Sequence, residues 1–131
     1  MLPQQIQKTM HRIRVLGQRI QDGDIRKGLL SIDRTVQEIL LHISLYPETQ
    51  NTSSIRSLCT AYLPMTEELT ERASRIETLS RPGAGAENAM NACRQTLGHT
   101  LPEALARLRD ELGVSGAADV EAQADALKKK L

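Results

Sequence analysis

The chain has 131 residues, with 17 Lys and Arg against 16 Asp and Glu, so its formal net charge is +1 at pH 7. This balance creates no overall field that favours nucleic acid or anionic lipid, and the only aromatic residues, Tyr46 and Tyr62, are too few to form the stacking platforms of single-strand binders. No apolar run approaches the roughly 20 residues that span a bilayer, so we expect one soluble, cytoplasmic domain over residues 1–131, with no membrane segment and no nucleic-acid partner.

The first two predicted elements are helices. Apolar residues at helical spacing form a first run that ends before Asp22-Gly23 and a second that ends before Pro47, because a residue that precedes proline is disfavoured in a helix. The runs are Ile6, Met10, Ile13, Gly17 and Ile20, then Ile25, Leu29, Ile32, Val36, Ile39 and Ile43. Folding back between the runs places Gly17 opposite Gly28, so we expect the two helices to approach closely there.

Three more helical runs follow a polar connection at residues 47–54. They are Ile55, Leu58, Tyr62, Met65, Leu69, Ala73, Ile76 and Leu79; Met90, Cys93, Leu97, Leu101, Leu105, Leu108 and Leu112; and Val120, Ala124, Leu127 and Leu131. Strand-like alternation is missing from the sequence. Single apolar stripes joined by short connections are typical of helices that pack beside their neighbours. The sequence therefore predicts an all-α fold, an antiparallel helical bundle of about five helices.

Two prolines, Pro64 and Pro102, interrupt the third and fourth runs. A proline inside a helix removes one hydrogen bond and crowds the carbonyl four residues back, which costs about 3 kcal/mol or more. If the long central hairpin folds back about residue 84, the two prolines fall at nearly the same level. We therefore expect matched kinks that bend the hairpin and create a concave binding surface. The alternative is a pair of uncoupled prolines on outer faces.

The residues with reactive side chains form no catalytic or metal-binding pattern. His11, His42 and His99 lie on three predicted helices, and none has a second His, Cys or carboxylate three or four residues further on, on a buried face in a metal-ligand pattern. In the predicted register Cys59 and Cys93 lie roughly 24 Å apart along the bundle, too far for a disulfide or a shared metal. We therefore predict no catalytic residue, no metal site and no cofactor.

The most specific stretch is IRSLCTAYLPMTEEL, residues 55–69. It resembles the signature of the XpaC-like family, the 5-bromo-4-chloroindolyl phosphate hydrolysis proteins, through Arg56, Leu58, Tyr62, Leu63, Pro64, Thr66 and Leu69. Ala61 and Met65 depart from that signature, where a second tyrosine and a threonine are usual. The similarity extends over about residues 10–131. Many members carry an N-terminal membrane segment, so this chain is either a soluble branch or a shortened form.

The resemblance implies a bacterial helical protein associated with TelA-like toxic-anion-resistance proteins. Our first interpretation is a non-catalytic interaction module in a toxic-anion or stress response, with a TelA-like protein as its partner. Its candidate interaction residues are Arg56, Tyr62, Leu63, Pro64 and Thr66. We also expect Tyr62 to be largely buried with its hydroxyl hydrogen-bonded. The alternative is a phosphoric-ester hydrolase, as the family name suggests, which needs a nucleophile or metal that the sequence does not supply.

Overall fold

The structure is a computed structural model that describes residues 2–113 and 127–128. The described residues contain helices and no strand, which confirms the all-α prediction. In chain order the elements are α1 (Leu2–Gln18), α2 (Gly23–Leu45), the 3₁₀ turn η1 (Pro47–Asn51), α3 (Ser53–Ser57), the π-helical turn η2 (Leu58–Tyr62), α4 (Leu63–Glu77), α5 (Ala84–Gln95), the π-helical turn η3 (Thr96–Thr100) and α6 (Leu101–Glu111).

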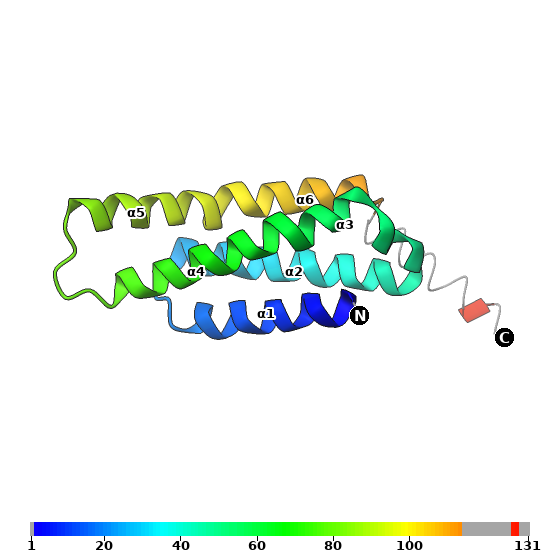
Figure 1. The fold of residues 1–131 in the computed structure, drawn as a ribbon, viewed down its shortest axis with the longest axis horizontal. Coiled ribbons are helices and arrows are strands. Elements are labelled where there is room, and N and C mark those ends of the chain that lie inside the picture. Colours follow the sequence, from blue (N-terminus) through cyan, green and yellow to red (C-terminus); the bar gives the residue numbers. More distant parts are fainter. Residues whose placement is uncertain (1, 114–126, 129–131) are drawn as a thin grey trace.

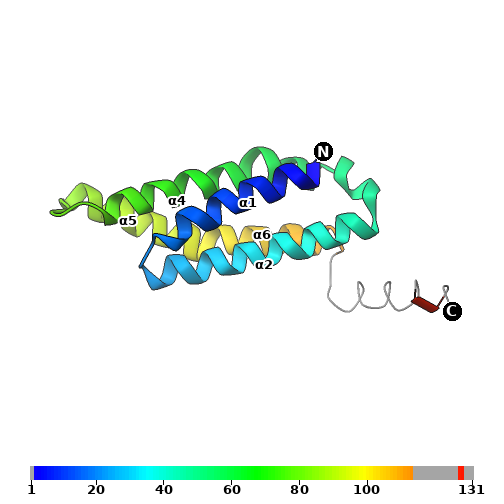
Figure 2. The ribbon, with the colours of Figure 1, turned by 90° about the horizontal axis from the view of Figure 1, so that it is seen from below.

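Four helical rods lie side by side in the described part of the chain (Figures 1 and 2). They are α1, α2, the continuous segment from α3 through η2 to α4, and the continuous segment from α5 through η3 to α6. α1 packs on α4, and α2 packs on α6 and η3. The fifth predicted helix, from Val120 to Leu131, lies almost wholly outside the described residues.

The second predicted run forms the centre of the core. All six of its apolar residues, from Ile25 to Ile43, are buried in α2. This helix begins after Asp22, whose side chain accepts a hydrogen bond from the Ile25 amide, as an N-cap residue does. It ends just before Pro47, as the sequence predicts.

The third run departs from its predicted face. Met65 is 46% exposed, whereas Thr66 and Thr70 are fully buried beside Leu63. The reason is η2, because a π-helical turn closes over five residues instead of four and so advances the buried face by one position. The prediction that Met65 faces the core is therefore wrong. The two buried threonine hydroxyls donate to carbonyls four residues back, at 2.7 and 2.6 Å, so their polar atoms are satisfied.

The predicted contact between Gly17 and Gly28 is also corrected. A Cβ atom on Gly17 would lie 3.0 Å from Cδ1 of Leu29, so this glycine makes room for a side chain of α2. Gly28 instead meets the backbone of η3, where Leu97 and Gly98 are its nearest neighbours. The prediction had the right reason for Gly28, a close helix contact, and the wrong partner.

A polar cluster fixes the end of the molecule where α1 joins α2. The carboxylate of Glu77, the last residue of α4, accepts hydrogen bonds from the backbone amides of Gln21 and Asp22 at 2.9 and 3.0 Å. The Asp22 carboxylate in turn pairs with the Arg94 guanidinium of α5. The short loop that joins α1 to α2 is therefore also bonded to α4 and α5, so it connects all four rods.

Candidate functional site

Each π-helical turn ends two residues before a proline. The Leu63 amide donates to the carbonyl of Leu58, five residues back, and the Leu101 amide donates in the same way to Thr96. Pro64 follows Leu63 directly, as Pro102 follows Leu101. Because the longer turn relieves the crowding that a proline causes in an α-helix, both rods continue through their prolines.

The π-helical turns also release backbone carbonyls. In an α-helix the Leu63 amide would bond to Cys59, and the Leu101 amide to Leu97. Both amides instead donate to the carbonyl one residue further back. The residue that follows each of these amides is a proline, which has no N–H to donate to the carbonyl left without a partner. The released carbonyl of Leu97 lies against Gly28 of α2. The backbone therefore departs from α-geometry at sites that contact a neighbouring rod.

The two π-helical turns lie on either side of the level of the prolines. η2 contacts α6, and η3 contacts α4. Around η2, Ala104 and Leu108 of the neighbouring rod line one groove together with Tyr62. Pro64 and Pro102 thus lie at similar heights along the long axis of the molecule. The π-helical turn that precedes each proline packs beside the helix that contains the other proline.

A polar groove lies between α3 and α6 beside η2, and we call it the α3–α6 groove. It has a volume of about 310 Å³ and is lined by Ser53, Ser54, Ser57, Tyr62, Ala104, Arg107, Leu108 and Glu111. Tyr62 is half-buried, and its hydroxyl makes no hydrogen bond within residues 2–113 or 127–128. Tyr62 packs against the core as a partly buried residue, but the predicted hydrogen bond of its hydroxyl is wrong for the described residues, and the phenol is available in the groove.

The five predicted interaction residues do not form one site. Tyr62 lines the α3–α6 groove, while Leu63 and Pro64 line a pocket of about 210 Å³ on the α1 side of the same rod. Thr66 is buried in the core. Arg56 is exposed and forms no ion pair in the described part of the chain. Only Tyr62 therefore belongs to the groove.

The groove also contains residues that the sequence analysis did not single out, namely Ser57, Arg107 and Glu111. The predicted register of the central hairpin places Ser57 opposite Glu111. These groove residues could therefore have been predicted from that register. Serine hydroxyls accept and donate, a guanidinium only donates and an ionised carboxylate only accepts. The groove can therefore hydrogen-bond to both donors and acceptors of a partner.

The two cysteines are poor candidates for a nucleophile. Both are free; Cys93 is buried and Cys59 is half-buried. Burial raises the pKa of both thiols, and for Cys93 the nearby charge of Arg72 opposes the effect without reversing it. A thiolate is the nucleophilic form, so neither residue is activated. Nor do the described residues contain a cluster of three His, Cys, Asp or Glu side chains that could hold a metal ion.

Comparisons with protein-family models, curated proteins and solved structures find no match to this chain. The resemblance to the XpaC-like family stays a prediction. Among the described residues, no helix combines the length and the apolar character that crossing a membrane requires.

Proposed function

We propose that the chain is a non-catalytic helical interaction module that binds a protein partner in the α3–α6 groove. The observation that supports this most directly is Tyr62, a half-buried phenol without a hydrogen-bond partner among the described residues, in a groove with charged and hydroxyl side chains. Tyrosine and arginine are enriched at the centres of protein interfaces, where an aromatic ring supplies contact area and its hydroxyl supplies direction.

The π-helical turn η2 explains why Tyr62 is available. Leu58 before it and Leu63 after it are both buried. Since the turn advances the buried face by one residue, Tyr62 falls between the two buried stripes and lies at the seam with α6. π-Helical turns are frequent at functional sites because they redirect side chains in this way.

The resemblance supplies the rest of the proposal. We propose a bacterial, cytoplasmic protein in a toxic-anion or stress response, with a TelA-like protein as partner. We also propose that the functional unit is an antiparallel bundle of about five helices, with proline kinks in its long central hairpin.

Crosslinking in cells tests this proposal. A photoreactive residue in place of Ser57, inside the groove, should trap a TelA-like protein in the native host, identified by mass spectrometry. Tyr62→Ala and Arg107→Glu in the same chain should abolish the crosslink without unfolding it. The matched control places the photoreactive residue at Arg81, an exposed position in the connection before α5. Equal trapping at both positions, or trapping that survives both substitutions, contradicts the proposal.

Phosphoric-ester hydrolysis is the second candidate function. The groove brings Arg107 together with three serine hydroxyls, which are the donors that a phosphate ester would accept from. Purified protein should be assayed with a chromogenic phosphate ester, with and without divalent metal ions. Turnover that persists through purification and is lost in Ser57→Ala would replace the interaction module as the function of the groove.

A further inference from the structure

A second groove lies between α1 and α2, on a surface distinct from the α3–α6 groove. We call it the α1–α2 groove. It has a volume of about 250 Å³ and is lined by Met10, Ile13, Arg14, Gly17, Gln18, Arg26, Leu29, Leu30 and Asp33. Its apolar lining residues are Met10, Ile13, Leu29 and Leu30, of which only Leu30 is exposed. Gly17 leaves the space open because it has no side chain there.

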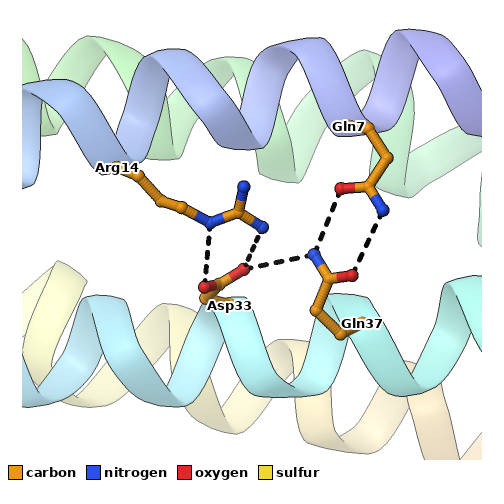
Figure 3. A network of polar contacts seen from close by, with 4 residues as sticks. All are labelled: Gln7, Arg14, Asp33 and Gln37. Carbon is orange, nitrogen blue, oxygen red and sulfur yellow. Dashed lines mark hydrogen bonds and ion pairs between the residues drawn. The ribbon is translucent and has the colours of Figure 1, made fainter.

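A network of hydrogen bonds closes the seam next to this groove. Arg14 donates to both carboxylate oxygens of Asp33 at 2.8 and 3.0 Å, and the Gln37 amide donates to the same carboxylate at 3.3 Å (Figure 3). Gln37 and Gln7 exchange two further hydrogen bonds at 3.2 and 3.3 Å. The network fixes α1 against α2 and neutralises the charges of Arg14 and Asp33. The groove is therefore a fixed opening between two clamped helices.

Leu30 gives the groove an unusual apolar rim. Its side chain is 65% exposed, the most of any large hydrophobic residue in the described chain. Pockets for drug-sized ligands have volumes of about 300–1,000 Å³, so this groove suits something smaller. It is large enough for one branched or aromatic side chain. Such a side chain would cover Leu30 and contact Leu29.

Cations flank this apolar rim. Arg26 and Arg34 lie four residues before and four residues after Leu30, so the three share one face of α2. The Arg26 guanidinium donates to the Ile20 carbonyl at 3.0 Å, and both arginines are exposed. Neither forms an ion pair with a carboxylate in residues 2–113 or 127–128. α1 contains no Asp or Glu, so the facing helix supplies no counter-charge.

We propose that the α1–α2 groove binds an acidic amphipathic helix of a protein partner. One apolar side chain of that helix enters the groove between Gly17 and Leu30. Carboxylates four residues before and four residues after it meet Arg26 and Arg34. Helix-in-groove recognition uses anchors at this helical spacing. The buried anchor supplies affinity, and the charges at the rim supply specificity and rate.

The groove suits a helix better than a membrane surface. A membrane-bound face needs a broad band of bulky apolar side chains above the charges. Among the apolar residues that line this groove only Leu30 is exposed, and the α1 side of the rim carries Gln18 and the neutralised Arg14. This inference is independent of the α3–α6 groove, so either can fail without the other.

Synthetic peptides test the proposal by fluorescence anisotropy with the full chain. The probe is a helical peptide of about 20 residues, with one leucine anchor and glutamates four residues on each side. A counterpart has lysines in place of the glutamates. The glutamate peptide should bind with a salt-dependent affinity, and the lysine peptide should not. Leu30→Ser should weaken binding by at least about tenfold. The matched control is Leu41→Ser, an exposed leucine further along α2 and outside the groove, which should change nothing.

Charge reversal gives a second, more specific test. Arg34→Glu should weaken binding of the glutamate peptide. The double variant with Arg26→Glu and Arg34→Glu should reverse the preference, so that it binds the lysine peptide. Circular dichroism should show that the variants stay folded. The proposal is overturned if the glutamate peptide does not bind saturably, if Leu41→Ser is as damaging as Leu30→Ser, or if the reversed variant keeps the original preference. Binding to anionic vesicles in preference to either peptide would also overturn it.

Discussion

Gly28 of α2 lies directly against the backbone of Leu97 in η3. A Cβ atom on residue 28 would stand 2.0 Å from the Leu97 carbonyl oxygen and 2.7 Å from its carbonyl carbon. This carbonyl is the one that the π-helical turn releases from its usual amide. The close contact between α2 and η3 therefore depends both on the absence of a side chain at Gly28 and on the irregular backbone at Leu97.

Gly28→Ala should destabilise the protein strongly. The added methyl group would meet backbone atoms, which cannot move aside as a flexible side chain can, so the loss should reach the upper end of the about 1–3 kcal/mol typical of overpacking. Urea denaturation followed by circular dichroism measures it. Gly98→Ala is the matched control, because its Cβ would make only ordinary contact with the Asp24 carbonyl oxygen at 3.4 Å. Similar losses for both variants would show that the close contact is not what Gly28 provides.

A pair of neighbouring substitutions tests the shifted face of α4. Met65→Ser should change the free energy of unfolding by less than about 0.5 kcal/mol because Met65 is a surface residue. Thr66→Met should cost about 1–3 kcal/mol because a larger side chain must enter a packed interior. The two unfolding midpoints give the comparison. If Met65→Ser lowers the unfolding midpoint more than Thr66→Met does, then Met65 faces the core and η2 does not shift the buried face.

The helical periodicity predicted most of the fold because most of the chain is regular. Every apolar residue predicted for α2 is buried, as are Met90, Cys93, Leu97, Leu101, Leu105 and Leu108 of the fourth run. The fourth run steps by four residues across η3, so its predicted face stays correct through that π-helical turn. At η2 a regular period of 3.6 residues per turn assigned Met65 to the core in place of Thr66, although Pro64 marked the irregular position.

The candidate site was harder to predict for a different reason. A register gives the level at which residues face one another, but not which of several neighbouring rods they face. Gly28 was therefore assigned to α1, whereas its close contact is with η3. In the same way Tyr62 was read as a core residue, while its place beside Arg107 depends on the extra residue of η2. Only Tyr62 of the five predicted residues lies in the α3–α6 groove.

The Asp22–Arg94 ion pair should make stability depend on pH. Burial opposes ionisation of Asp22, but hydrogen bonds from Arg94 and the Ile25 amide outweigh it and hold the pKa of this carboxyl below its ordinary value of 3.8. A lowered pKa contributes stability that is present above pH 3.8 and is lost as the pH falls below it. Asp22→Asn keeps a good N-cap and removes the charge. It should therefore lower the free energy of unfolding by about 0.5–1 kcal/mol at pH 7.

The same comparison at low pH provides the control for the charge. Near pH 3 and below, the difference between wild type and Asp22→Asn should shrink, because the wild-type carboxyl becomes protonated. A difference at Asp22 that stays constant from pH 7 to pH 3 would assign its effect to capping alone.

The two thiols should react at different rates with a disulfide reagent. Cys59 is half-buried and Cys93 is buried, and burial raises the pKa of both, so the native protein should show a slow phase for Cys59 and a much slower one for Cys93. Absorbance of the released chromophore at pH 8 measures both phases. Cys59→Ala should leave only the slower phase. A thiol that reacts faster than free cysteine would reopen the case for a cysteine nucleophile.

Deleting one residue tests whether η2 exists to absorb an extra residue. Ala61 is exposed in η2, and removing it should convert the π-helical turn into α-helix. The buried residues before the turn, Ile55 and Leu58, should then stay on the same helix face as the buried residues after it, Leu63 and Thr66. The deletion needs Pro64→Ala, because proline would crowd the carbonyl four residues back in the regular helix. We expect this variant to unfold cooperatively, with the folded state retained.

The matched control deletes Glu71, an exposed residue within α4, in the same Pro64→Ala background. That deletion leaves the π-helical turn in place and rotates Ala73 and Ser74 by one position, so it should remove buried contacts with α1 and α5 and lower the unfolding midpoint far more. If the two deletions are equally damaging, η2 does not absorb an extra residue. The Ala61 deletion also moves Tyr62 relative to α6. A folded Ala61-deleted chain should therefore lose the crosslink from Ser57, which would connect the irregular turn to partner binding and separate it from stability.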